Sequence, residues 1–253
     1  DRDALCLQMR YSYIPAPHSI YRGIAKLPPG CLLTVSARTR EPRLTSYWSG
    51  PHQVAAGVTA PFAGSAEQAV EALDTLLREA VQAQMIADVP LGAFLSGGVD
   101  SSTVVALMQA QSARPVKTFS IGFHEEGYNE AEYAKAVAAH LGTEHTELYV
   151  HAQQALSIIP RLQSVYDEPF SDSSQLPTIL VSQLARQHVT VSLSGDAGDE
   201  LFCGYNRYQL AARLWKTVNA APLPLRRLAA RGITAIPIDT WNRLARRTAR
   251  YLP

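Results

Sequence analysis

The sequence lacks the features that would direct a protein into a membrane, out of the cell or onto nucleic acid. No apolar run approaches the roughly 18 residues that a membrane span needs, and no secretion signal opens the chain. The three cysteines lie far apart without a CxxC pair, so we expect reduced thiols in a cytoplasm, with no disulfide framework or zinc site. A net charge of +1 argues against nucleic acid and membrane surfaces as partners.

The chain has 253 residues and a hydrophobic fraction of 47 %, enough for one large domain or for a domain with an appendage. Residues 1–60 are rich in proline turns, and residues 50–64 show little periodicity, which is typical of a linker. We therefore expect a junction segment over residues 1–60 and one domain over residues 61–253.

From residue 65 onward, helical and strand patterns alternate. Ser65 and Gln68 form a capping-box pattern before an apolar helical repeat, and Asn129 and Gly142 bound a later helix. Buried strands are predicted at residues 89–95, 116–123, 144–150 and 189–193, with helices at about 65–85, from 100 onward, and at 129–142, 151–165 and 173–187. This order predicts an α/β fold, a doubly wound parallel sheet with flanking helices.

The strongest motif lies between the first strand and the helix after it. It reads Ser96-Gly97-Gly98-Val99-Asp100-Ser101-Ser102. Two glycines let the backbone approach a phosphate closely, and the amides of a helix N-terminus favour an anion. Asp100 would repel a phosphate unless a cation lay between them, which indicates Mg²⁺.

Other interpretations of this loop are weaker. It lacks the Gly-Lys-Ser/Thr of a Walker A loop, and Phe94 stands where a Gly-x-Ser-x-Gly elbow needs glycine. A simple glycine turn with Asp100 as a helix cap remains the plain alternative.

A second acidic loop follows the fourth strand. It reads Ser194-Gly195-Asp196-Ala197-Gly198-Asp199-Glu200. Three carboxylates so close together repel one another unless a metal or another cation binds them. If the strand order reverses between the first and fourth strands, both loops face the crevice where ligands bind in such sheets. Helix capping by Asp196 and Asp199 is the alternative.

Several further residues allow both a functional and a structural interpretation. Asp167, Glu168 and Asp172 could orient a substrate amine or a second metal, or cap a loop; Tyr205 and Arg207 could touch a phosphate or pair with Asp199 or Glu200. His145, with no ligand spacing, is expected at the surface or in the core. The arginine-rich tail from about residue 210 is expected to be a solvated helical face or to pair with other sequence, rather than a nucleic-acid arm.

Together the two loops resemble the synthetase part of the class B, glutamine-dependent asparagine synthetases, which are N-type ATP pyrophosphatases of the PP-loop group. Further matching motifs are Tyr13-Ile14-Pro15-Ala16-Pro17, Lys26-Leu27-Pro28-Pro29-Gly30, Asp167-Glu168-Pro169-Phe170 and Leu201-Phe202-Cys203-Gly204-Tyr205. The match covers nearly all of the chain up to about Tyr208. It implies an adenine nucleotide alpha-hydrolase-like fold, with residues 1–60 following a glutaminase domain that the sequence does not include and residues 61–253 forming a synthetase domain whose C-terminal part is incomplete.

The resemblance also implies a ligase activity. ATP and Mg²⁺ would activate aspartate, or a related carboxylate, as an acyl-adenylate with release of pyrophosphate, and ammonia from a glutaminase domain would then give asparagine. Roles follow for the residues that match: Ser96, Gly97, Gly98, Asp100, Ser101 and Ser102 at the pyrophosphate; Leu95, Ile121, Ser194 and Gly195 at the adenosine; Asp100 and Asp199 on magnesium; Asp196, with Asp100, as a catalytic residue.

The chain also departs from the family's pattern. Asp196 stands where a glutamate is common and Ala197 where a glycine is expected, and a lysine on which members rely is not evident after Lys135. An isolated fragment could therefore be inactive. Two other functions stay open: a lactam- or macrocycle-forming adenylating enzyme, and a catalytically silent nucleotide-binding module. The oligomeric state is open as well, with a homodimer as one form.

Overall fold

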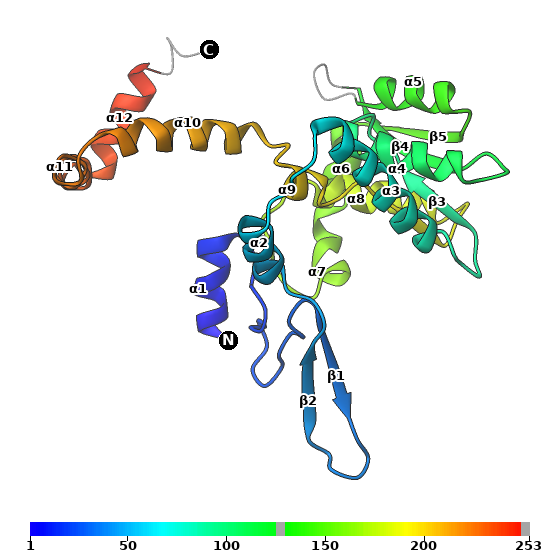
Figure 1. The fold of residues 1–253 in the computed structure, drawn as a ribbon, viewed down its shortest axis with the longest axis horizontal. Helices are drawn as coiled ribbons and strands as arrows, with labels where there is room; N and C mark the ends of the chain where they lie inside the picture. Colours follow the sequence, from blue (N-terminus) through cyan, green and yellow to red (C-terminus); the bar gives the residue numbers. More distant parts are fainter. Residues whose placement is uncertain (125–129, 249–253) are drawn as a thin grey trace. The chain divides into compact units, whose positions relative to one another are not determined.

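The computed structural model describes residues 1–124 and 130–248, and the chain divides into two compact units (Figure 1). The first unit is Asp1–Gly195, and the second begins at Asp196. The boundary thus falls within the second acidic loop. The predicted helix cap Asn129 lies outside the described residues.

The first unit opens with elements that precede the sheet-forming part. These are helix α1 (Arg2–Tyr11), the antiparallel strands β1 (Cys31–Val35) and β2 (Pro42–Ser46), and helix α2 (Gly50–Thr59). The linker prediction was wrong over α2. Ser49 caps this helix by accepting a hydrogen bond from the His52 amide at 3.5 Å, and Pro51 occupies the first turn, where its missing N–H costs nothing.

A four-stranded parallel sheet forms the body of the unit. Its strands are β3 (Leu91–Phe94), β4 (Lys117–Phe123), β5 (Glu144–Val150) and β6 (Val191–Leu193), in the spatial order β5-β4-β3-β6. The order reverses between β3 and β6, the first and the fourth strand of the sheet along the chain. The predicted parallel sheet with flanking helices is confirmed, and the carboxyl ends of β3 and β6 lie side by side.

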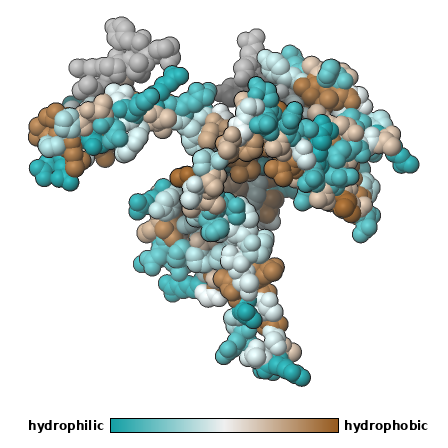
Figure 2. All heavy atoms as spheres, viewed as in Figure 1, coloured by the Kyte–Doolittle hydropathy of each residue, from teal (hydrophilic) through white to brown (hydrophobic). Residues whose placement is uncertain are grey.

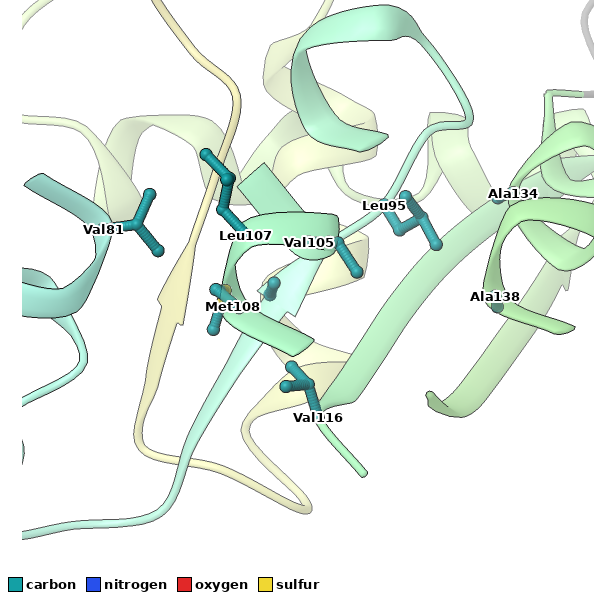
Figure 3. Packing of buried hydrophobic residues seen from close by; sticks show 9 residues of the cluster. Val81, Leu95, Val105, Leu107, Met108, Val116, Ala134 and Ala138 are labelled. Carbon is teal, nitrogen blue, oxygen red and sulfur yellow. The ribbon is translucent and has the colours of Figure 1, made fainter. Parts of the chain in front are cut away.

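Helices cover both faces of the sheet. On one face lie α3 (Ala66–Gln84), α4 (Val99–Ala110) and α5 (Ala131–Leu141), and on the other lies α8 (Gln175–Ala185). Figure 3 shows the first core, where Val105 and Met108 of α4 pack with Leu95 and Val116. Successive side chains of β3 point to opposite faces of the sheet, so the strand contributes to a core on each face. Ala93 belongs to the core beneath α3, α4 and α5, whereas Phe94 packs on the cluster of Phe119 and α8.

Local signals fix several helix ends. The capping box at Ser65 and Gln68 is confirmed, with the Ser65 amide donating to the Gln68 side chain at 2.9 Å. Gly142 ends α5 in the left-handed conformation, as predicted. The predicted helix 151–165 is instead broken into α6 (Ala152–Leu156), the 3₁₀ turn η1 (Ile159–Arg161) and α7 (Leu162–Val165), because Pro160 cannot donate to a continuing helix.

The second unit is helical over its described residues. It contains α9 (Gly198–Phe202), α10 (Asn206–Ala220), α11 (Leu223–Ala235) and α12 (Ile238–Thr248). Figure 2 shows hydrophobic residues among hydrophilic ones on these helices, and several large apolar side chains are exposed, including Leu210, Leu214, Trp215 and Leu228. Across both described ranges, no helix combines the length and the apolar character that crossing a membrane requires.

Candidate functional site

The loop between β3 and α4 turns sharply at Gly97. Its φ of +81° is one that only glycine adopts without cost, and a Cβ there would lie 2.6 Å from the amide nitrogen of Ala134. Gly98 then caps α4 without any side-chain hydrogen bond. The backbone is therefore packed against the start of α5 on one side.

Serine side chains hold this loop closed. The Ser96 amide donates to Ser101 Oγ at 3.2 Å, the Gly98 amide donates to Ser96 Oγ at 3.2 Å, and the two hydroxyl oxygens are 2.9 Å apart. Ser101 is buried, whereas Ser96 and Gly98 are exposed. The hydroxyls thus brace the turn, while the first amides of α4 have no acceptor one turn earlier in the helix and are available to an anion.

Gly195, at the end of β6, lies directly against this helix start. A Cβ on Gly195 would lie 2.6 Å from the backbone nitrogen of Ser101 and 2.9 Å from the carbonyl carbon of Asp100. The prediction that a strand reversal brings the end of the fourth strand beside the first loop is therefore confirmed for Ser194-Gly195. Both glycines, Gly97 and Gly195, are required by close packing of backbones.

The other predicted nucleotide-binding residues are divided between the two faces of the sheet. Leu95 is buried in the core beneath α4 and α5, whereas Ile121 packs on the opposite face against the cluster of Val150 and α8. Ser102 Oγ is buried and has no hydrogen-bond partner, an unusual condition for a buried hydroxyl. The roles of these side chains toward adenosine and pyrophosphate stay predictions.

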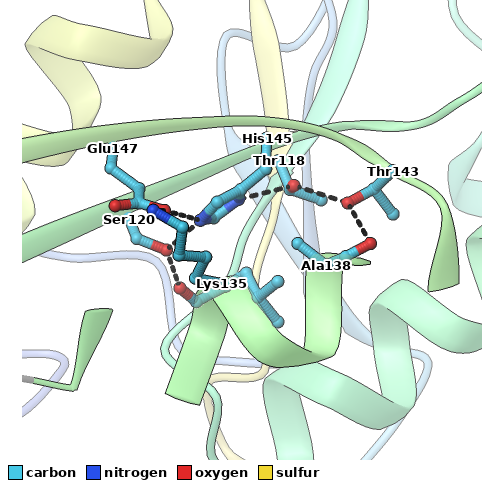
Figure 4. Close-up of polar contacts among 8 residues, drawn as sticks. Thr118, Ser120, Lys135, Ala138, Thr143, His145 and Glu147 are labelled. Atoms are coloured by element: carbon cyan, nitrogen blue, oxygen red, sulfur yellow. Dashed lines mark hydrogen bonds and ion pairs between the residues drawn. The ribbon is translucent and has the colours of Figure 1, made fainter. Parts of the chain in front are cut away.

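A buried polar group beneath the loop was not predicted. The hydroxyl of Ser120, in β4, donates a hydrogen bond to the carbonyl of Leu95, the residue that precedes the loop. Thr118 and His145 continue this network (Figure 4). A signal was present in the sequence, since Thr118 and Ser120 are polar residues two apart in a strand expected to be buried, and so share one face.

The second acidic loop belongs to the second unit, apart from Ser194 and Gly195. Ala197 has a φ of +71° and caps α9, so alanine occupies a left-handed position that favours glycine. The Tyr205 hydroxyl donates to Glu200 at 2.8 Å, and this hydrogen bond raises the pKa of Tyr205. Arg207 stacks over the ring of Tyr205 at 4.0 Å. The structural interpretation of Tyr205 and Arg207, pairing beside the acidic loop, is thus confirmed for Tyr205 with Glu200.

The acidic residues after α7 also have structural partners. Glu168 forms an ion pair with Lys26 and accepts a hydrogen bond from the Ile20 amide at 2.7 Å. Asp172 accepts one from the Ser174 amide at 2.8 Å, which confirms loop capping at that position. Glu168 is occupied in binding Ile20 and Lys26 to this loop.

Asp100 lies in the first turn of α4, in the first unit, and Asp196 and Asp199 lie in the second. Their joint binding of a metal stays a prediction. Among the described residues, no three or more histidine, cysteine, aspartate or glutamate side chains gather in a group that could hold a metal ion.

Comparisons with known proteins identify the family of this chain. The family model described as asparagine synthase matches residues 72–252. An asparagine synthetase homologue of Methanocaldococcus jannaschii is 41 % identical over 206 residues, covering 81 % of this chain and 38 % of that protein. Asparagine synthetase 1 (glutamine-hydrolysing) of Bacillus subtilis is 32 % identical over 210 residues, covering 83 % of this chain and 32 % of that protein.

The chain thus spans about a third of the length of these curated relatives. Among solved structures, the ammonia-dependent NAD synthetase of Campylobacter jejuni matches with a TM-score of 0.37 at 18 % identity, over 56 % of this chain and 62 % of that one. The family match, which covers most of the sheet-forming unit and the helices after it, decides the assignment: this chain belongs to the asparagine synthase family.

Proposed function

We propose that this chain is the ATP-using synthetase part of a glutamine-dependent asparagine synthetase. The supporting observation is the glycine-rich loop Ser96–Gly98, which lies at the strand reversal beside Gly195 in a chain of the asparagine synthase family. This position suits a nucleotide whose phosphates lie on the N-terminus of α4.

The proposed reaction has two steps. A carboxylate oxygen of aspartate attacks the α-phosphorus of ATP, the bond to the bridging oxygen breaks, and pyrophosphate leaves an acyl-adenylate. Ammonia then attacks the acyl carbon, loses a proton and expels AMP, which gives asparagine. The chain contributes mainly by positioning the reactants and by presenting backbone amides to the phosphates, rather than by covalent catalysis.

Within the first unit, the phosphate contacts are assigned to the amides and hydroxyls of Ser96, Gly97, Gly98, Ser101 and Ser102. The unpartnered Ser102 hydroxyl fits this role, since a phosphate oxygen would supply the acceptor that it lacks. Leu95, Ile121, Ser194 and Gly195 are assigned to the adenosine. Of these, Ser194 and Gly195 follow β6 and so lie at the reversal itself.

We assign magnesium to the carboxylates of Asp100 and Asp199, as the family resemblance implies. Mg²⁺ is commonly held by one or two carboxylates together with substrate phosphates, so a protein cage of three ligands is not needed. When bound, it would neutralise charge on the departing pyrophosphate. Asp196 is assigned to the incoming amine, where its carboxylate is one methylene shorter than the glutamate common in the family.

The decisive experiment is ATP–pyrophosphate exchange by the full-length protein with Mg²⁺ and a panel of carboxylates. We expect exchange with aspartate and a loss on the order of 10²-fold in Asp100→Asn, the scale seen when a group acting on transition-state charge is removed. Asp74→Asn is the matched control, because Asp74 pairs with Arg78 on the exposed face of α3. No exchange with any carboxylate would refute the proposal.

Two other family functions are distinguished by the same preparation. A lactam or macrocycle former would use an internal amine, so its product would have the mass of the substrate less one water. A silent nucleotide-binding module would bind ATP in calorimetry without turnover. The departures from the family's pattern at Asp196 and Ala197, and the lysine that is not evident after Lys135, motivate the second of these comparisons.

A further inference from the structure

A polar network lies between the sheet and α5, directly beneath the carbonyl that leads into the loop. Thr118 and Ser120 of β4 face His145 and Glu147 of β5, to which they are directly paired in register. The imidazole is only 9 % exposed, and Thr118 and Ser120 are buried. Figure 4 shows these side chains pointing toward one another, with Thr143 completing the row.

The distances define a row of hydrogen bonds. Thr143 Oγ1 lies 3.0 Å from Thr118 Oγ1, which lies 2.9 Å from His145 Nδ1. His145 Nε2 lies 3.4 Å from Ser120 Oγ, and the Ser120 hydroxyl donates to the Leu95 carbonyl. Five residues thus connect the turn before β5 with the last residue before Ser96.

The protons in this row can be assigned. The Ser120 hydroxyl has one proton, which it donates in its hydrogen bond to the Leu95 carbonyl. Ser120 Oγ must therefore accept a hydrogen bond from His145 Nε2. Burial lowers the pKa of His145 and outweighs the attraction of the Glu147 carboxylate, which would raise it. The neutral ring is therefore favoured. With its proton on Nε2, Nδ1 accepts from the Thr118 hydroxyl. The Thr143 hydroxyl lies 3.0 Å from Thr118 Oγ1 and donates to the Ala138 carbonyl at 3.5 Å. From Thr118 onward, each donor points toward the loop.

The Leu95 carbonyl is where the chain leaves the sheet. The paired residues of β3 and β4 end at Phe94 and Phe119, and the Leu95 amide makes one further bond to the Phe119 carbonyl at 2.9 Å. The Ser120 hydroxyl then fixes the direction of the next peptide group, from which the Ser96 amide donates to Ser101 Oγ. The orientation of Leu95 therefore determines where the turn at Gly97 begins.

We infer that His145 is a positioning residue for the phosphate loop, acting through Ser120 on the carbonyl of Leu95. The expected effect on ATP binding rests on the proposed function. The effect of His145 on the orientation of the loop does not. In this inference His145 acts only through Ser120 and is assigned no contact with a reactant. Its effect is to hold the Ser120 hydroxyl in the one orientation that completes the end of β3.

The first test is amide hydrogen exchange of the full-length protein without nucleotide, read on a peptide that spans residues 95–101. Ser120→Ala and His145→Phe should raise exchange at the Ser96 and Gly98 amides by roughly fivefold or more, the change expected from loss of one net hydrogen bond. His145→Gln should restore protection, because its amide can both donate to Ser120 and accept from Thr118.

Thr143→Val is the matched control. It removes a hydroxyl from the far end of the same row, with a comparable loss of fold stability, but leaves Ser120 and Leu95 in place. Loop exchange in Thr143→Val should equal that of the wild type. Equal exchange in Ser120→Ala, His145→Phe and Thr143→Val would overturn the inference.

The second test measures binding of ATP with Mg²⁺ to the same proteins by calorimetry. Ser120→Ala and His145→Phe should raise the dissociation constant roughly fivefold, with Thr143→Val unchanged. If the wild type does not bind ATP, the proposed function fails, and the exchange result still decides whether His145 positions the loop. Wild-type affinity in Ser120→Ala despite a loosened loop would overturn the functional part of the inference.

Discussion

Lys26, in the segment before β1, forms an ion pair with Glu168, in the loop that follows α7. Glu168 also accepts from the Ile20 amide, and Lys26 Nζ donates to the Ile14 carbonyl at 2.6 Å. The Glu168 side chain is only 17 % exposed. These contacts join residues 14–26 to a loop about 150 residues later, so the segment before the sheet is part of the folded first unit.

Removing the Glu168 carboxylate should destabilise the protein. In Glu168→Leu the Ile20 amide and Lys26 lose their shared acceptor, and we expect a loss of about 1–3 kcal/mol in the free energy of unfolding. Urea unfolding measures this value. Arg78→Met is the control, because Arg78 and Asp74 form an exposed pair at helical spacing, and its loss should cost only about 0.5 kcal/mol. Equal losses in both variants would contradict the prediction.

The same carboxylate should make stability depend on acid. Burial alone would raise the pKa of Glu168, but hydrogen bonds from Lys26, Ile20 and Ser19 together outweigh burial and lower it below its ordinary value of 4.5. The stabilisation is therefore complete above about pH 4.5 and is lost as the pH falls through the lower folded pKa. Unfolding at several acidic pH values should show this dependence weakened in Glu168→Leu and unchanged in Arg78→Met.

Replacing Ala197 with glycine should not destabilise the second unit. An alanine in the left-handed conformation costs about 1 kcal/mol or more of folding free energy, and glycine removes this cost. Glycine also has a more flexible unfolded chain, and the entropy lost on folding offsets roughly half to all of the gain. We expect Ala197→Gly to be neutral or to gain up to about 1 kcal/mol. Ala212→Gly, within α10, has the same entropy cost without relief and should lose about 1 kcal/mol. A melting temperature lowered equally by both substitutions would show that the backbone at Ala197 is not strained.

Local patterns in the sequence were sufficient to predict the four strands of the parallel sheet, the two loops at strand ends and the capping of α3, but not the antiparallel pair β1 and β2. The strand reversal between β3 and β6 could be stated only as a condition, because pairing between distant strands has no local signature. The network of Ser120 and His145 was missed for the same reason: it depends on the register of β4 with β5. Helix α2 was missed because it buries no residue and so shows no apolar repeat.

The space around Gly97 can be tested apart from its backbone angle. Gly97 and Gly142 both have positive φ, +81° and +71°, but a Cβ at Gly97 would lie 2.6 Å from the Ala134 amide nitrogen, while one at Gly142 would meet nothing within 4 Å. Gly142→Ala should therefore cost about 1 kcal/mol, and Gly97→Ala about 2–4 kcal/mol, since α5 must also shift. Gly97→Ala should in addition weaken ATP binding. Similar melting temperatures for the two variants would show that packing at Gly97 is not tight.

The buried imidazole of His145 predicts a second pH dependence, near neutrality. Burial lowers the pKa of His145 from its ordinary value of 6.5, against the attraction of Glu147 and with the repulsion of Lys135. Between the lowered folded pKa and about pH 6.5, the unfolded chain binds a proton on this histidine and the folded protein does not. The free energy of unfolding therefore falls as the pH drops below about 6.5 and levels off below the folded pKa. The free energy of unfolding can change by at most about 1.4 kcal/mol per pH unit, which corresponds to the uptake of one proton. Urea unfolding between about pH 5 and 8 should show this slope in the wild type and a smaller one in His145→Gln. The two proteins differ only at residue 145, so identical slopes would mean that the ring is not buried as described.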